Sequence, residues 1–133
     1  MNTDDIHRYI LGAYGTFTLT SKKTGKSFTY SRWDKGDFKA VSLLTGPDNN
    51  ADYSYMGKLW SSADGKQLRL YSTRGSRIAE DAPSFKALAW FLQHLDSDMV
   101  EFRHEGHCCR CGHKLTTPES IDRGIGPYCA TKI

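Results

Sequence analysis

Three cysteines near the end of the chain, Cys108, Cys111 and Cys129, have the residue type and the spacing of metal ligands. Two residues separate Cys108 from Cys111, and Gly112 follows, which is typical of a knuckle, a tight turn that points two thiolates at one ion. The chain starts with acidic and polar residues where a secretory signal would be basic, so we expect a reducing compartment without disulfides. We therefore predict a structural Zn²⁺ site in this tail.

Three thiolates leave one tetrahedral position for another ligand, and the nearby candidates are histidines. His104 is the first choice, because the residues that follow it give the chain room to bend back toward the metal. His107 adjoins Cys108, and neighbours on an extended segment face opposite sides. His113 follows the knuckle glycine, where the chain leaves the metal, so our order is His104, then His107, then His113. Cys109 lies inside the turn and is expected to point away from the ion.

The rest of the tail carries signals for two short helices. Thr117 and Pro118 form a helix start, with a hydroxyl cap and a proline at the first position, and Gly124 ends this helix. Pro127 begins a second turn that holds Cys129 at the positive end of a helix dipole, which favours a thiolate. The tail has too few large apolar side chains for a core of its own, so we expect the ion to supply folding free energy. The layout predicts a treble-clef-like finger.

The same residues carry a resemblance to a known family. Besides the knuckle, the pattern comprises His104-Glu105-Gly106, Leu115-Thr116, Pro118-Glu119-Ser120-Ile121, Gly124-Ile125-Gly126-Pro127-x-Cys129 and, upstream, Ser42 to Asn49 with Asp52-Tyr53. It resembles an uncharacterised family of small proteins from phages, plasmids and other mobile elements that end in a zinc-finger-like domain. The resemblance implies that Cys108, Cys111 and Cys129 bind the metal together with a histidine before the knuckle. It implies a phage or mobile-element origin and no activity.

The residues before the tail predict an α+β fold. Alternating or apolar runs indicate strands at 16–20, 27–30, 38–44, 53–60, 67–72 and 99–103, and helical spacing indicates helices at 5–13 and from Pro83 to Leu95. We expect an antiparallel sheet of about five strands, packed by one main helix. The α+β body should span residues 1–103 and the finger residues 104–133. No Gly- or Pro-rich linker separates them, so we expect the finger to be rigidly attached.

The charge distribution raises the question of a nucleic-acid partner. Residues 1–77 hold 12 Lys and Arg against 7 Asp and Glu, whereas residues 78–133 hold 6 against 8. Basic side chains interleaved with aromatic ones on a sheet attract phosphates and stack on bases. The predicted nucleic-acid contacts are Lys22, Lys23, Lys26, Arg32, Trp33, Lys35, Arg74 and Arg77.

A second class of function also fits the sequence. A protein-binding module that inhibits or redirects a host factor would use exposed aromatic anchors, for which the candidates are Tyr14, Trp33, Tyr53, Tyr55 and Trp60. We expect no enzyme, because the finger lacks the asparagine of a His-Asn-His nuclease and a cysteine-rich zinc site is usually closed. No apolar run reaches the roughly 20 residues that span a membrane, so we expect a cytoplasmic protein of a bacterial host. The oligomeric state is left open.

Overall fold

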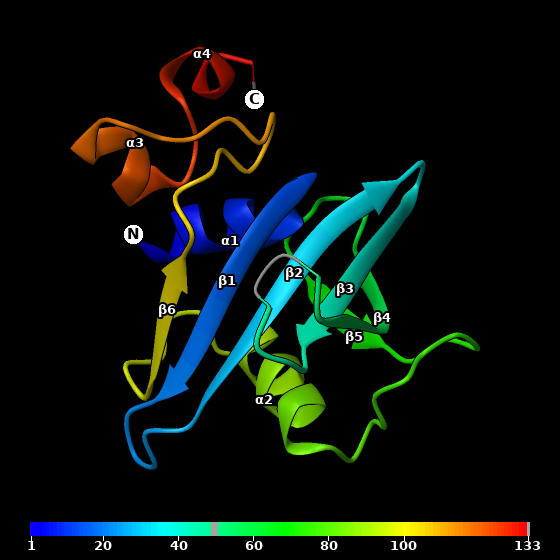
Figure 1. The fold of residues 1–133 in the computed structure, drawn as a ribbon. Coiled ribbons are helices and arrows are strands. Elements are labelled where there is room, and N and C mark those ends of the chain that lie inside the picture. Colours follow the sequence, from blue (N-terminus) through cyan, green and yellow to red (C-terminus); the bar gives the residue numbers. More distant parts are fainter. Residues whose placement is uncertain (49–50, 133) are drawn as a thin grey trace.

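The computed structural model describes residues 1–48 and 51–132 and contains ten helices and strands within them (Figure 1). In chain order these are α1 (Thr3–Leu11), β1 (Tyr14–Ser21), β2 (Ser27–Lys35), β3 (Phe38–Leu44), β4 (Tyr53–Ser61), β5 (Leu68–Tyr71), α2 (Pro83–Leu92), β6 (Val100–His104), α3 (Pro118–Arg123) and α4 (Pro127–Ala130). The predicted α+β class is confirmed. Among the described residues, no helix combines the length and apolar character needed to cross a membrane.

One antiparallel sheet contains all six strands, in the order β5-β4-β3-β2-β1-β6. The sequence estimate of about five strands is therefore too low. Strands β1 to β5 follow one another as neighbours, and β6 returns after α2 to pair with β1 at the opposite edge. This return places the start of the tail beside the first strand of the chain (Figure 1).

Helices α1 and α2 supply the core that packs on one face of the sheet. Phe85, Leu88 and Phe91 of α2 are buried, as their helical spacing predicts, and join Tyr9 and Ile10 of α1 in a single hydrophobic core. Helix α1 begins earlier than expected because Asn2 and Asp5 form a capping box. It ends at Leu11 rather than at residue 13. The chain then passes close to the tail on its way to β1, because a side chain at Gly12 would meet the carbonyl oxygen of Cys109 at 2.4 Å.

A buried arginine joins α1 to the sheet. Arg32 is only 2% exposed, and its guanidinium donates to the carbonyl oxygens of Ile10 (2.8 Å), Gly12 and Ala40 (3.0 Å). It also forms an ion pair with Asp34 at 2.9 Å. These bonds satisfy carbonyl groups that the C-terminus of α1 leaves without helical partners. Arg32 is thus inaccessible to a ligand, and its prediction as a nucleic-acid contact is wrong.

The face of the sheet opposite the helices, here called the open face, carries an aligned set of aromatic and polar side chains. A bulge at Met56 inserts one extra residue into β4 opposite Val41 and Ser42 of β3. Past the bulge, Trp33, Ala40, Lys58 and Tyr71 lie side by side on β2, β3, β4 and β5. Tyr14 of β1 continues the line beside Trp33. We call Tyr14, Trp33, Ala40, Lys58 and Tyr71 the cross-strand row.

Replacing Arg32 by methionine should destabilise the protein strongly. The change keeps apolar volume but leaves buried carbonyl groups of α1 and β3 without donors, and we expect a loss of about 3 kcal/mol or more. Urea unfolding of the metal-saturated protein measures this loss. The matched control is Arg74→Met, an exposed position, whose effect should stay within about 0.5 kcal/mol. Equal stability of the two variants would contradict the role of Arg32.

Candidate metal centre

The three predicted cysteine ligands come together. Cys108 and Cys111 lie in the turn that follows β6, and Cys129 lies in α4. Their three Sγ atoms all lie within 4.8 Å of one another, close enough for one ion to contact them all. Cys108 and Cys129 are buried and Cys111 is exposed. The cluster therefore has one edge that opens to solvent.

The knuckle turn is fixed by its backbone. The Cys108 N–H donates to the carbonyl oxygen of His113 (2.8 Å), and the Gly112 N–H donates back to the carbonyl oxygen of Cys108 (2.9 Å). Gly112 has φ of 79°, a left-handed conformation that a glycine adopts without a steric penalty. The glycine after the second cysteine therefore has the role that the sequence predicts for it.

N–H groups surround the Cys108 sulfur. The backbone N–H groups of Arg110 and Gly126 both donate to Cys108 Sγ at 3.4 Å, so the two ends of the tail converge on one atom. Burial raises the pKa of Cys108, but N–H groups, including those of Gly126 and Arg110, lower it more, and the pKa falls to about 7. The Arg110 guanidinium donates to Cys129 Sγ at 3.5 Å. The N–H groups around Cys108 thus favour its thiolate, the form that binds metal.

Cys109 faces away from the cluster toward α1. Its carbonyl oxygen accepts a hydrogen bond from the Tyr14 N–H (3.1 Å), and its own N–H donates to the carbonyl oxygen of Gly124 (2.9 Å). Burial is the main reason why the pKa of its thiol is raised to about 11. A thiol of this kind stays protonated at neutral pH and packs as a small apolar group.

The histidines are arranged differently from our order of preference. Both ring nitrogens of His104 have partners: Nε2 contacts the carbonyl oxygen of Ile121, and Nδ1 accepts from the Gly106 N–H at 2.9 Å. His107 Nδ1 contacts the carbonyl oxygen of Gly112 at 3.1 Å. His113 Nδ1 lies 3.6 Å from Cys111 Sγ. The last-ranked candidate is thus the one that contacts a cluster sulfur, and the geometry of His104 disfavours its use as the fourth ligand.

A pocket of about 270 Å³ borders the cluster. All three cysteines line it, together with His113, Leu115 and residues of α3 and α4. The donor set fits Zn²⁺, which binds sulfur and imidazole, and the pocket leaves space for a fourth ligand on the exposed side.

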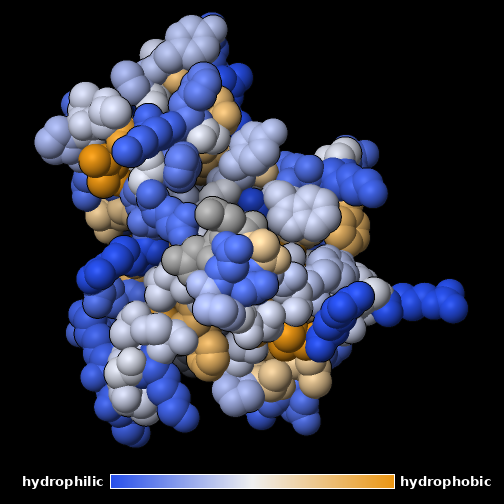
Figure 2. Space-filling model, in the orientation of Figure 1, coloured by the Kyte–Doolittle hydropathy of each residue, from blue (hydrophilic) through white to orange (hydrophobic). Residues whose placement is uncertain are grey.

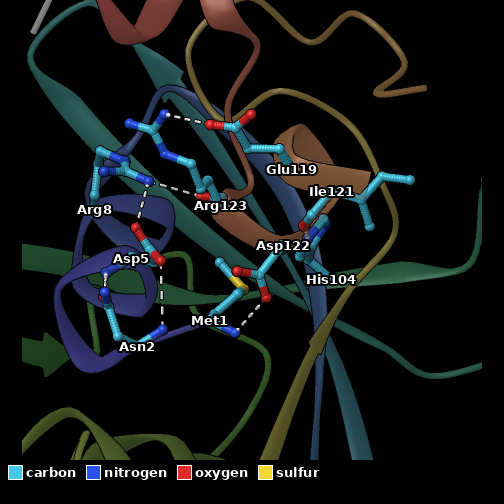
Figure 3. A network of polar contacts seen from close by, with 9 residues as sticks. All are labelled: Met1, Asn2, Asp5, Arg8, His104, Glu119, Ile121, Asp122 and Arg123. Atoms are coloured by element: carbon cyan, nitrogen blue, oxygen red, sulfur yellow. Dashed lines mark hydrogen bonds and ion pairs between the residues drawn. The ribbon is translucent and has the colours of Figure 1, made fainter. Parts of the chain in front are cut away.

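The tail packs on α1 through a polar network that the sequence did not reveal (Figure 3). Arg8 of α1 donates to the carbonyl oxygen of Arg123 (2.7 Å) and also pairs with Asp5 (2.8 Å). A second link is the ion pair between the amino group of Met1 and Asp122, at 2.9 Å. Gly124 ends α3 in a left-handed conformation, as predicted, and lies against Tyr9 so closely that a side chain there would meet the ring at 2.6 Å. In the sequence, only the helical pattern around Arg8 could have indicated the contact between α1 and the tail.

The remaining predicted residues do not form one patch. Lys22, Lys23 and Lys26 are exposed at the turn between β1 and β2, whereas Trp33 and Lys35 lie at the other end of β2. Trp33 follows Ser27 by six positions along the strand, a distance of roughly 20 Å. Arg74 and Arg77 are exposed in the segment between β5 and α2.

Comparison with known proteins relates the tail to an uncharacterised group. Residues 98–133 match DUF6011, a family of unknown function. The matched segment includes β6 as well as the whole tail, so it extends across the predicted boundary at residue 103. The chain matches no curated protein and no solved structure.

Single replacement of Cys108, Cys111 or Cys129 by serine should lower the amount of zinc that stays bound after desalting at least about tenfold, because each removes a thiolate ligand. Elemental analysis by mass spectrometry gives the metal content per chain. The matched control is Cys109→Ala, which removes a neighbouring cysteine that points elsewhere and should keep its zinc.

Cobalt substitution extends this measurement to the histidines. His113→Ala should shift the visible absorption of the Co²⁺ form if the imidazole completes the site, whereas His104→Ala should leave the spectrum unchanged. Retention of zinc by all three serine variants would contradict the assignment of the cluster.

Proposed function

We propose that Cys108, Cys111 and Cys129 hold a structural Zn²⁺ ion that keeps the tail folded against α1. The observation that supports this proposal is the convergence of the three sulfurs within 4.8 Å. N–H donors at Cys108 and Cys129 prepare these two sulfurs for a cation. We further propose His113 as the fourth protein ligand, because its imidazole contacts the exposed sulfur.

The donor set favours a structural role over catalysis. Zinc bound by several thiolates carries little positive charge to polarise a substrate or activate water, and sulfur-rich sites are generally structural. Glu119, a carboxylate of α3, pairs with Arg123 at 3.8 Å. Among the described residues of the tail, Leu115 and Ile125 are the only buried large apolar side chains besides the cysteines, so an ion has much to contribute to its stability.

Removal of the metal should unfold the tail but leave the sheet intact. With a strong chelator, amide hydrogen exchange should become fast from 105 to 132 and stay slow in β2, β3 and β4, because these strands have their own core. Re-addition of one equivalent of Zn²⁺ should restore protection. Unchanged exchange in the tail of a metal-free sample would refute the structural role.

We propose in addition that the open face binds single-stranded nucleic acid. The specific observation is the cross-strand row: Tyr14 is 52% exposed, Trp33 38% and Tyr71 48%, and the row includes Lys58. Aromatic rings on neighbouring strands can stack on successive bases while basic groups attract the phosphates between them. Lys35 and Arg69, both exposed, flank the row on the adjacent line of residues.

The character of this surface also supports a polar ligand. Figures 1 and 2 view the molecule from the side opposite α1, and in this view hydrophilic residues dominate while hydrophobic ones are exposed only in small separate places. Large protein interfaces usually have an apolar centre. The alternative, a module that binds a host protein through the same aromatic anchors, is favoured less by this distribution. On the resemblance alone, we propose an accessory role in a phage or mobile element, in the cytoplasm of its host.

Replacing Trp33 by alanine should weaken binding of a fluorescent single-stranded oligonucleotide about tenfold, the usual effect of losing one stacking ring. Fluorescence anisotropy measures the affinity, which should also fall steeply as salt rises. The control is Trp90→Ala, an equally exposed tryptophan on α2, with an expected change of less than about twofold.

A second variant, with Lys22, Lys23 and Lys26 replaced by glutamate, tests the hairpin separately. Because the hairpin lies far from the row, this variant should weaken binding of a long strand more than that of a short one. The absence of any binding at low salt would refute the proposal and favour a protein partner.

A further inference from the structure

Strand β6 forms an uncovered edge of the sheet. Its register with β1 is regular and continues beyond both ends of the strand. Glu105 N–H donates to the Thr16 carbonyl oxygen, and Lys22 N–H donates to the Met99 carbonyl oxygen. In an antiparallel pair, alternate residues direct both backbone groups at the partner strand. Residues 99, 101, 103 and 105 therefore bond β1, and the N–H and C=O groups of Val100, Phe102 and His104 point outward.

These outward groups have no hydrogen-bond partner in the described part of the chain. The strand order ends at β6, and no other element pairs with it. In Figure 1 no element runs alongside its outer side. An edge of this kind is a template for another strand, and proteins commonly protect such edges with charges. The charges of β6 are arranged so that they suit one particular partner.

The sequence of β6, Val-Glu-Phe-Arg-His, is complementary to itself in antiparallel orientation. If two copies pair about Phe102, then Glu101 of each copy lies opposite Arg103 of the other, and Val100 lies opposite His104. The residues with outward backbone groups then form the hydrogen-bonded pairs, each exchanging two bonds. The charged residues form the closer, non-hydrogen-bonded pairs, where opposite charges stabilise pairing.

The charges also disfavour the two neighbouring registers. Pairing about residue 103 would place Arg103 opposite Arg103, and pairing about residue 101 would place Glu101 opposite Glu101. Like charges directly opposite destabilise a strand pair. In the single chain, Glu101 and Arg103 are both exposed and pair with each other at 2.6 Å, so they are available for exchange across an interface.

The other side of β6 offers apolar surface for the same contact. Val100 and Phe102 are only partly buried and line a groove of about 430 Å³ together with Ile6 and Leu95. Opposite residues in an antiparallel pair lie on the same face of the sheet. The Phe102 side chain of a second copy would therefore extend over this groove and bury part of its apolar surface.

We propose that two copies of this chain pair through β6, antiparallel and centred on Phe102, into one continuous sheet. The partner is a second copy because the charge pattern of β6 is complementary to itself when two copies pair about Phe102. The contact is small, so the dimer should depend on concentration. It uses none of the proposed metal ligands and none of the residues of the cross-strand row, so it goes beyond the proposed function.

Charge exchange provides the test. Sedimentation equilibrium of the zinc-loaded full chain should show a monomer–dimer equilibrium. Arg103→Glu should raise the dissociation constant about tenfold or more, because both charged pairs become repulsive. The double variant Glu101→Arg with Arg103→Glu exchanges the charges and should restore dimerisation. Arg69→Glu on the opposite edge strand β5 is the control and should have no effect.

A backbone variant tests the strand pairing independently of the charges. Val100→Pro removes one outward N–H and blocks the partner strand, a change that edge strands tolerate within the single chain. It should yield a folded, zinc-containing monomer by circular dichroism and metal analysis. A wild-type chain that remains monomeric at millimolar concentration, or a dimer that persists in both Arg103→Glu and Val100→Pro, would overturn the proposal.

Discussion

The position of α1 depends on one buried guanidinium, and much of the structure depends on α1. Arg32 of β2 binds the carbonyl groups at the end of this helix and thereby sets its place on the sheet. The opposite side of α1 meets the tail through Arg8 and Tyr9. A buried cation is costly unless every donor finds an acceptor, so the helix cannot slide without leaving that charge unpaired. The tail is therefore placed by the body through a helix that both share.

The tail itself shows how a short segment compensates for the lack of a core. Its buried apolar side chains are few, and the sulfur atoms occupy the place where a larger protein would have packed aliphatic groups. The sulfur of Cys108 accepts hydrogen bonds from N–H groups at both ends of the segment. These bonds hold the knuckle and the start of α4 together without a cation. The docking against Tyr9 adds the apolar contact that the tail cannot provide alone. Thiolate chemistry and helix packing thus act on the same residues.

Local signals in the sequence were sufficient where the structure depends on local physics. The knuckle, the Thr117 cap and the left-handed Gly124 follow from rules that apply over a few residues, and the structure has them where expected. Strand pairing across the chain was less accessible, because nothing in the residues of β6 says that it returns to β1. The order of preference for the histidines differs from their contacts in the structure for a related reason: sequence distance from the knuckle does not determine where a ring points. The burial of Arg32 could have been found, since strand alternation puts it on the same face as Phe28 and Tyr30.

The bulge in β4 decides which side chains the molecule presents to its surroundings. Tyr53 and Tyr55 are odd-numbered and Lys58 and Trp60 even-numbered, yet register places them on one face because Met56 is an extra residue. If Met56 were paired in a regular ladder instead of forming the bulge, everything after it would be inverted: Lys58 and Trp60 would turn inward, and Leu59 would turn to water. Deletion of Met56 would instead leave a regular strand with Lys58 and Trp60 on their present face. The phase of the strand is therefore as informative as its residue types when related chains are aligned.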